Sequence, residues 1–502
     1  MRRKALSMEP KHVMEAVLSS SRPLVLCLFL VAVVALPAGA YAETRLTASD
    51  GVVGDRFGSS VATSGNTIVV GASGDDANGS AYVFKFNGTD WVEETKLTAS
   101  DGGRAEGGDS FGASVAITGN TVVVGAPFHG HIDNDHGAAY VFKFNGLNWV
   151  EEAELLAGDR SIEDWLGISV TDTETFAVAG APNNVSPVDQ KGAVYVFRHN
   201  GTEWVQTKLT ASDAALYDGF GISVAIAGNT VVVGAPGHVH GDYQGAAYIF
   251  KYDGTGWVEE VELHAGDGVL GWPVAISGST IVVGGTGNDG KRSVYVFKYN
   301  GTDWMEEGRL TASDGVAGDN FGSSVAASGN TIVVGANLYD TKGSAYVFKY
   351  NGTDWVEEFN LAASDGASSD DFGASVGITG STIVVGASGS GSYKGAAYVY
   401  RLESTIDDIL AFFDASIADG DLVGVGLKPG TTNRAVKVFR KALEQAEYYI
   451  DNRQKSRACA VLGEAYRRVD GNPKPSDIIA GAEASQLATM IQNVRLTLGC
   501  PL

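Results

Sequence analysis

The chain has 502 residues, of which 44% are hydrophobic and 19% charged, a composition typical of globular rather than disordered proteins. Its 36 basic and 59 acidic residues give a net charge of −23, and so acidic a surface repels nucleic acid and anionic lipid. Its 66 glycines against only 12 prolines indicate many tight turns and exclude a collagen-like protein.

The N-terminus has the pattern of an export signal. Basic residues precede an apolar run from Pro23 to Leu36, and Ala40-Tyr41-Ala42 then matches the small-x-small pattern that signal peptidases recognise. The apolar run is shorter than the roughly 20 residues that a membrane-spanning helix needs, although a membrane anchor is the alternative. We predict that residues 1–42 form a signal peptide cleaved after Ala42. The mature chain, without a membrane span, would then be secreted or located in the cell envelope.

A Phe-Gly or Leu-Gly pair recurs seven times at intervals of 50 to 55 residues. Each copy contains four short runs rich in valine, isoleucine, tyrosine and phenylalanine, which predicts four β-strands. An Asn-Gly pair before the last run favours a type I′ hairpin turn. The recurring pairs are Phe57-Gly58, Phe111-Gly112, Leu166-Gly167, Phe220-Gly221, Leu270-Gly271, Phe321-Gly322 and Phe372-Gly373. In the first copy the predicted strands are Phe57–Thr63, Thr67–Gly71, Ala81–Phe86 and Trp91–Leu97.

Repeated four-stranded units of this length indicate a β-propeller, with an open solenoid as the alternative. The seventh copy has only three strand-like runs, whereas Glu43–Asp50 matches the end of the missing fourth strand, as comparison with Thr95–Asp101 shows. One extra strand at the front would therefore complete the last blade and close the ring. We predict that residues 43–402 form an all-β, seven-bladed propeller of four-stranded antiparallel blades.

The Phe-Gly pair, followed by a Val-Val-Gly-Ala-Pro run as at Val123–Pro127 and Val232–Pro236, resembles the FG-GAP repeat of integrin alpha chains and of many secreted bacterial proteins. The resemblance covers residues 43–402 and implies a propeller that binds ligands through the loops of one face, in adhesion or surface recognition. Integrin-type repeats often carry a calcium cage before the Val-Val-Gly-Ala strand. Here that place holds short turns such as Ser64-Gly65-Asn66, which cannot supply six to eight oxygen ligands. We therefore expect no integrin-type calcium cage and no required cofactor.

Residues 403–502 lack the repeat and show helical periodicity, which predicts a small all-α domain. The domain weakly resembles the FIMAH domains of secreted bacterial proteins. It would dock on a partner or on the cell envelope, and a passive bundle is the alternative. The four predicted helices are Ile406–Ile417, Thr432–Tyr449, Lys455–Arg468 and Ile479–Leu496.

Two cysteines, Cys459 and Cys500, remain after removal of the predicted signal peptide. Both lie in the predicted helical domain, and an exported protein meets an oxidising environment. A disulfide between them and two free thiols are the alternatives that the sequence leaves open.

Pairs of aspartates precede the Phe-Gly pair in most copies. A ring of such carboxylates could hold calcium or attract a basic ligand. In the alternative interpretation, which their recurrence favours, they accept backbone N–H groups and shape the turn into each blade. The pairs are Asp50 with Asp55, Asp101 with Asp109, Asp213 with Asp218, Asp314 with Asp319, and Asp365 with Asp370 and Asp371.

Histidines gather in the loops between the second and third strands of the second and fourth copies only. A His-x-His pattern in a loop can chelate zinc or copper, although histidines of this kind also occur as plain surface residues. The candidate metal ligands are His129, His131, His238 and His240. The candidate ligand-binding residues are Phe128, His129, His131, Asp133, Asp135, His136, His238, His240, Asp242, Tyr243 and Tyr339.

The sequence contains no Gly-x-Ser-x-Gly elbow, His-Glu-x-x-His motif, P-loop or dinucleotide fingerprint, so it predicts no enzyme. We expect a secreted or cell-surface recognition or adhesion protein that binds an extracellular protein or glycan through loops of one propeller face. The alternatives are a carbohydrate-binding propeller and a hydrolase with a site in the central channel. The loops that vary most between copies are Phe128–Gly137, Asn183–Lys191, Gly237–Gln244 and Asn337–Lys342.

Overall fold

The computed structural model describes the chain from Glu43 onward with short gaps, so the predicted signal peptide lies outside the described residues. Within the described part, no helix is both long and apolar enough to cross a membrane. The undescribed residues after Glu43 are 77, 103–107, 132–133, 184, 187–188, 241–242, 267, 317, 339–341, 403–408, 411–412, 414–416, 418–422, 425–431, 452–453, 470–478, 481–483, 498–499 and 501–502.

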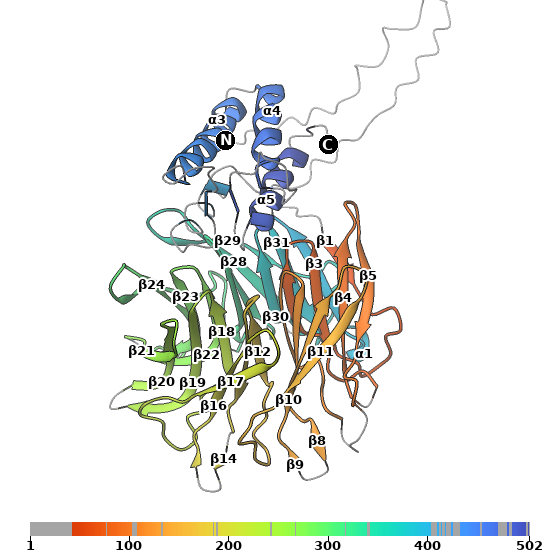
Figure 1. Ribbon diagram of the computed structural model, residues 1–502, viewed down its shortest axis with the longest axis vertical. Helices are drawn as coiled ribbons and strands as arrows, with labels where there is room; N and C mark the ends of the chain where they lie inside the picture. The colour runs from red at the N-terminus through yellow and green to blue at the C-terminus, as the bar shows by residue number, and fades with distance from the viewer. Residues whose placement is uncertain are drawn as a thin grey trace, which may run out of the picture. The chain divides into compact units, whose positions relative to one another are not determined.

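The repeats form a seven-bladed β-propeller of four-stranded antiparallel blades, as predicted (Figure 1). A single parallel pairing, Gln244 with Val269, also links the sheets of blades 4 and 5. Blades 1 to 3 consist of β2 (Phe57–Ser64), β3 (Thr67–Ala72), β4 (Ser80–Phe86) and β5 (Trp91–Leu97); β6 (Ser114–Thr118), β7 (Thr121–Ala126), β10 (Ala138–Phe144) and β11 (Trp149–Leu155); and β12 (Ser169–Asp172), β13 (Phe176–Ala181), β16 (Ala193–His199) and β17 (Trp204–Leu209).

The remaining blades follow the same strand order. They consist of β18 (Ser223–Ala227), β19 (Thr230–His240), β20 (Tyr243–Tyr252) and β21 (Trp257–Leu263); β22 (Gly268–Ser277), β23 (Thr280–Gly287), β24 (Arg292–Tyr299) and β25 (Trp304–Leu310); β26 (Phe321–Ser328), β27 (Thr331–Ala336), β28 (Ser344–Tyr350) and β29 (Trp355–Leu361); and β30 (Phe372–Thr379), β31 (Thr382–Ala387), β32 (Ala396–Arg401) and β1 (Glu43–Leu46).

The burial of each strand follows its position in the blade. Every residue of the second strand is buried in blade 1, from Thr67 to Ala72, because neighbouring blades cover both faces of the sheet. The fourth strand, Trp91–Leu97, alternates between more and less exposed residues because one face meets solvent. The strands of the first copy lie within one residue of their predicted bounds.

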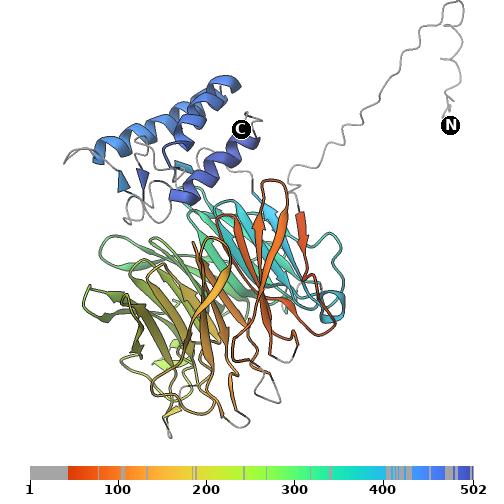
Figure 2. The same ribbon diagram turned by 45° about the vertical axis from the view of Figure 1, so that its right-hand side comes forward.

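The N-terminal strand closes the ring, as its sequence predicted. β1 pairs antiparallel with β32, with Glu43 opposite Tyr400 and Leu46 opposite Ala397. On the other side of blade 7, the Ser375 hydroxyl donates a hydrogen bond of 2.9 Å to the carbonyl oxygen of Gly58 in blade 1. The first and last parts of the propeller, orange and cyan in Figure 2, therefore lie side by side, as they would not in an open solenoid.

A backbone contact between glycines joins successive blades. The glycine near the end of each second strand lies against the carbonyl oxygen of the Phe-Gly or Leu-Gly glycine in the next blade. A Cβ at this glycine would lie only 1.9 to 2.1 Å from that oxygen, so no other residue fits without a shift of backbone. The pairs are Gly71 with Gly112, Gly125 with Gly167, Gly180 with Gly221, Gly234 with Gly271, Gly335 with Gly373, and Gly386 with Gly58.

The junction between blades 5 and 6 departs from this pattern. In blade 5, Trp272 and Pro273 occupy the positions after the Leu-Gly pair. A Cβ at Gly284 would meet Pro273 of its own blade at 2.5 Å, and the nearest atom to a Cβ at Gly322 of blade 6 is a Val294 methyl at 3.2 Å. The glycine contact seen at the other six junctions is replaced here by Arg292 of blade 5, which donates hydrogen bonds to the carbonyl oxygens of Phe321 at 3.1 Å and Gly322 at 3.5 Å in blade 6.

A methyl group at one of these contacts should destabilise the propeller. We expect Gly125→Ala to lower the free energy of unfolding by about 1–3 kcal/mol, because its Cβ would meet the Gly167 carbonyl oxygen at 1.9 Å. Gly308→Ala is the matched control, since its Cβ would have nothing within 4 Å. Denaturant unfolding measures both variants, and equal stability of the two would contradict the contact.

The C-terminal region contains the helices α3 (Thr432–Asp451), α4 (Lys455–Tyr466) and α5 (Ala484–Thr497), and the propeller contains the short helix α1 (Ser390–Tyr393). Apolar side chains from α3, α4 and α5 share one core, which explains the helical periodicity. The prediction that the last helix begins at Ile479 was wrong. Ile479 and Ala480 form β34, which pairs with β33 (Val423–Gly424), and α5 begins at Ala484. Most of the predicted helix at 406–417 lies outside the described residues.

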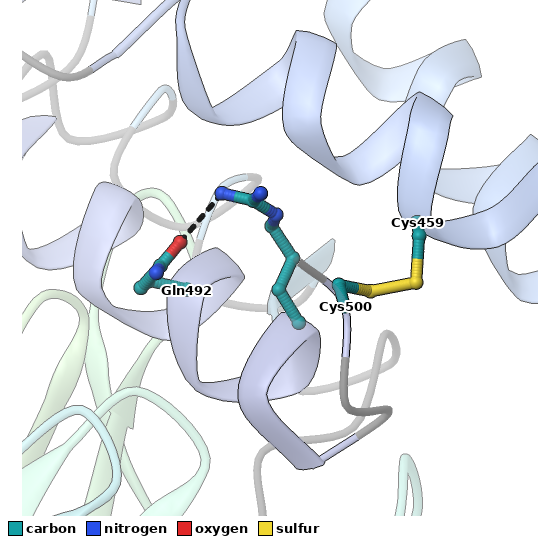
Figure 3. Close-up of a disulfide and its surroundings, with 4 residues drawn as sticks. Cys459, Gln492 and Cys500 are labelled. Atoms are coloured by element: carbon teal, nitrogen blue, oxygen red, sulfur yellow. Dashed lines mark hydrogen bonds between the residues drawn. A yellow bond between two sulfur atoms is a disulfide. The ribbon is translucent and has the colours of Figure 1, made fainter. Parts of the chain in front are cut away.

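Cys459 of α4 and Cys500 beyond α5 are joined in a disulfide with a Cα–Cα distance of 5.4 Å (Figure 3). The bond closes a loop across 41 positions of sequence. By the chain-entropy account, closing a loop of this length stabilises the folded state by about 4 kcal/mol. Next to it, Arg495 of α5 donates a hydrogen bond of 2.7 Å to Gln492, within the same helix.

Candidate functional site

Two sets of loops lie at the same end of the propeller. Strand direction alternates within a blade, so the loop from the second to the third strand and the loop leading into the next blade meet at one end. Gly54 N–H, in the loop leading into blade 1, donates to the carbonyl oxygen of Tyr393 in blade 7 at 3.1 Å, and Gly74 N–H donates to that of Asp55 at 3.0 Å. We call this end, with both sets of loops, the loop face.

Three consecutive blades carry extended loops on the loop face. Blade 2 adds the ribbon β8 (Gly130–His131) and β9 (Asn134–Asp135), and blade 3 adds β14 (Val185–Ser186) and β15 (Asp189–Gln190). In blade 4, β19 and β20 continue past the core of the sheet through the pairs Val239–Gln244 and His240–Tyr243. The ribbons of blades 2 and 3, with labels β8, β9 and β14, lie at the bottom of Figure 1. The three extended loops coincide with three of the four loops that vary most in sequence.

The structure describes only some of the predicted site residues. Phe128 is partly exposed and its ring lies 5.9 Å from that of Trp165, while the His136 carbonyl oxygen accepts the Leu166 N–H. Burial lowers the pKa of His136. Asp133, Asp242 and Tyr339 lie outside the described residues, as do the side chains of His131, Asp135, His240 and Tyr243.

A fully buried tyrosine occupies the third strand of every blade, and its hydroxyl points toward the loop face. In six blades the hydroxyl donates a hydrogen bond to the first aspartate of the preceding loop. Burial raises the pKa of Tyr82, Tyr140, Tyr248 and Tyr398. The bonds are Tyr82 to Asp50 (2.7 Å), Tyr140 to Asp101 (2.9 Å), Tyr195 to Asp159 (2.6 Å), Tyr248 to Asp213 (3.0 Å), Tyr346 to Asp314 (2.8 Å) and Tyr398 to Asp365 (2.6 Å).

The second aspartate of these loops is buried and accepts a backbone N–H three residues earlier in the chain. Asp218 accepts the Ala215 N–H at 2.7 Å, and Asp319 accepts that of Val316 at 2.6 Å. These are the contacts that the turn-shaping interpretation of the acidic pairs requires. Calcium binding at the same carboxylates stays a prediction.

Next to the tyrosine, blades 1, 2, 4 and 5 carry an ion pair between the second-to-third loop and the fourth strand. In blade 1 the loop supplies the acid and the strand the base, with Asp75 Oδ2 2.6 Å from Lys96 Nζ. In blade 2 the loop supplies the base, His129, and the strand supplies the acid, Glu154. Glu154 and its counterpart Glu262 were not predicted from the sequence. The available signal was the residue before the leucine that ends the fourth strand. It is glutamate in β11 and β21 but lysine in β5.

In blade 2, three carboxylates surround His129. Its Nδ1 lies 3.4 Å from Asp109 Oδ2, and its Nε2 lies 3.3 Å from Glu154 Oε1 and 3.7 Å from Asp101 Oδ2. Hydrogen bonds to Asp109 and Glu154 outweigh burial and raise the pKa of His129 to about 10. His129 is therefore an imidazolium ion at neutral pH.

Blade 4 repeats the arrangement around His238, whose side chain is only 3% exposed. His238 Nδ1 lies 3.0 Å from Asp218 Oδ2, and its Nε2 lies 3.2 Å from Glu262 Oε1 and 3.5 Å from Asp213 Oδ2. A second histidine, His264, approaches the same Glu262 Oε1 with its Nε2 at 3.2 Å. The structure thus groups the predicted ligands His129 and His238 with carboxylates of other segments.

The FG-GAP repeat profile matches seven segments that together span most of residues 42–400. The chain belongs to the FG-GAP repeat family. An FG-GAP propeller supports a general role in ligand binding or recognition. The matched segments are residues 42–84, 91–142, 149–197, 204–250, 257–297, 304–348 and 355–400.

No curated protein matches the sequence. Among solved structures, a chain in the crystal structure of the mitotic checkpoint complex is similar to this FG-GAP protein at 11% identity and a TM-score of 0.46, over 76% of this chain and 99% of that one. A polysaccharide lyase of a new family, ulvan lyase bound to -[GlcA(1-4)Rha3S]-, is similar at 11% identity and a TM-score of 0.45, over 73% and 99%. Similarity at this level carries no functional inference.

The raised pKa of His129 predicts a loss of stability in alkali. A group whose pKa is higher in the folded than in the unfolded state stabilises the fold fully below its unfolded pKa of about 6.5. The contribution then falls as the pH rises through the folded value of about 10. We expect the difference in unfolding free energy between wild type and His129→Gln to shrink between pH 6.5 and 10. Denaturant unfolding across this range measures it, and a constant difference would contradict the imidazolium assignment.

Proposed function

We propose that this FG-GAP protein is an extracellular recognition protein that binds a protein partner through its loop face. The predicted signal peptide and the disulfide between Cys459 and Cys500 support an oxidising, extracellular location. The surface of the partner would combine apolar groups with basic ones, since the chain carries a net charge of −23.

The observation that carries the proposal is the exposure of large apolar side chains in the loops of the loop face. Large apolar side chains exposed on one face are typical of protein-binding sites, because leaving them in water is unfavourable unless a partner covers them. Tyr217 is the most exposed of them, at 72%. The set is Val52, Val53, Phe128, Ile162, Leu216, Tyr217, Val239, Val316, Leu338 and Tyr393.

The outer surface of the blades also has exposed apolar residues, but in a different arrangement. They occupy one repeated position, directly after the tryptophan that begins the fourth strand, as at Val92, Val150 and Val258. A position that repeats in this way is accounted for by the strand pattern. Most of the loop-face residues also lie at a repeated place, between the two aspartates of the loop into a blade, but they differ in type from blade to blade, which favours recognition of one specific partner.

Carbohydrate binding is less well supported. Such sites use exposed aromatic rings, but only three of the ten exposed apolar residues of the loop face are aromatic, namely Phe128, Tyr217 and Tyr393. The tryptophans at the start of the fourth strands pack against an aromatic residue of the third strand. Their ring centroids lie 5.3 Å apart for Phe86 and Trp91, and 5.2 Å apart for Tyr299 and Trp304. These pairs flank the hairpin turns, at the end of the blade opposite the loop face.

A binding test separates these functions. We expect the purified protein to bind a member of an array of extracellular proteins, and Tyr217→Ser to weaken that binding by at least about 1 kcal/mol. Val258→Ser on the outer strand of blade 4, where the side chain is 55% exposed, is the matched control and should bind like wild type. Binding only to a parallel glycan array, or equal losses in both variants, would contradict a protein-binding loop face.

A further inference from the structure

We propose that blade 4 binds a divalent transition-metal ion, with Zn²⁺ as its representative, through Asp213, His238 and Glu262 and with His264 next to them. The site lies beneath the extended loop of blade 4. It is independent of the partner-binding function proposed above. It also differs from the His-x-His pattern in the sequence, because its donors come from three separate segments.

The donor atoms have the spacing of metal ligands. One atom from each of Asp213, His238 and Glu262 lies within 4.8 Å of the other two. His238 Nε2 is 3.2 Å from Glu262 Oε1 and 3.5 Å from Asp213 Oδ2. Bonds of about 2.0–2.2 Å to a tetrahedral Zn²⁺ place neighbouring ligand atoms about 3.4 Å apart. Two of the donor distances therefore match the edges of a zinc tetrahedron.

Neighbouring groups orient these donors. Asp218 faces His238 Nδ1 at 3.0 Å and is itself held by the Ala215 N–H, which leaves Nε2 directed at the carboxylates. The Tyr248 hydroxyl donates to Oδ1 of Asp213, so that Oδ2 is the oxygen toward His238. A carboxylate behind a histidine and a hydrogen bond behind a carboxylate are the usual support of metal ligands.

Glu262 provides the strongest reason for a cation. Its Oε1 is buried and accepts no hydrogen bond within the described residues, although His238 Nε2 and His264 Nε2 each lie 3.2 Å away. A buried carboxylate oxygen that faces two imidazole nitrogens without a well-aligned hydrogen bond to either is unfavourable. A metal ion between the imidazole nitrogens and the carboxylate oxygens would offset the cost of burying this oxygen. The mixed nitrogen and oxygen donors favour zinc or a similar metal over calcium, which prefers oxygen alone.

Blade 2 provides an internal comparison within the same chain. It has the equivalent trio of Asp101, His129 and Glu154, but Leu156 occupies the position of His264. Glu154 is also more exposed than Glu262, at 30% against 19% of the side chain. The second imidazole and the buried oxygen therefore distinguish blade 4 as the metal site.

The test is calorimetric titration of the purified protein with Zn²⁺ near neutral pH. We expect one saturable site in wild type, a Kd at least tenfold weaker in Glu262→Gln, and an unchanged Kd in the matched variant Glu154→Gln. His264→Leu should also weaken binding. This variant keeps the test decisive if Glu262→Gln fails to fold, because blade 2 already accommodates leucine at that position.

Circular dichroism checks that each variant is folded. Absence of saturable Zn²⁺ binding to wild type would overturn the proposal. So would wild-type affinity in both Glu262→Gln and His264→Leu, or equal losses in Glu262→Gln and Glu154→Gln.

Discussion

The propeller depends on one backbone contact, in which a glycine of the second strand lies against a glycine carbonyl of the next blade. A serine hydroxyl of the first strand binds the same oxygen, as Ser114 does to Gly167 at 2.8 Å. Because the contact leaves no space for a Cβ, both positions are restricted to small residues and the blades approach closely. The glycines of the Phe-Gly pair and of the Val-Val-Gly-Ala run thus form the two sides of this contact, which we call the glycine joint. Between Gly386 and Gly58 the same joint closes the ring.

Most of the fold could be predicted because its signals lie within short segments of the sequence or in the number of strands per repeat. Runs of β-branched residues and Asn-Gly turns define the strands, and one extra strand before the first copy with one missing strand in the last copy indicates closure. The candidate site could not be predicted in the same way. The partners of His129 come from the preceding loop and from β11, whereas its neighbours in sequence suggested His131. The start of α5 was misplaced because Ile479 satisfies helical periodicity yet pairs with β33.

The loop face shows how a repeated scaffold gains individual sites. Each blade presents a buried tyrosine, which in six blades bonds to a carboxylate, and two positions beside it can change without disturbing the joint. Aspartate with lysine in blade 1 and histidine with glutamate in blade 2 form ion pairs of opposite direction. In blade 4 one more histidine, His264, converts the same geometry into a set of metal donors. Above these clusters, the extended loops of blades 2 to 4 provide the surface that differs most from blade to blade.

The most direct test of the closed ring is native-state hydrogen exchange of the backbone amides. If the glycine joint between Gly386 and Gly58 holds the ring closed, amides paired between β1 and β32 should exchange with the same high opening free energy as those in the centre of blades 2 and 3. The blade 5 to blade 6 junction, which lacks the joint, should be the least protected boundary. Exchange of the β1 and β32 amides through a separate opening of low free energy would contradict this account, since the ring would then open at its ends.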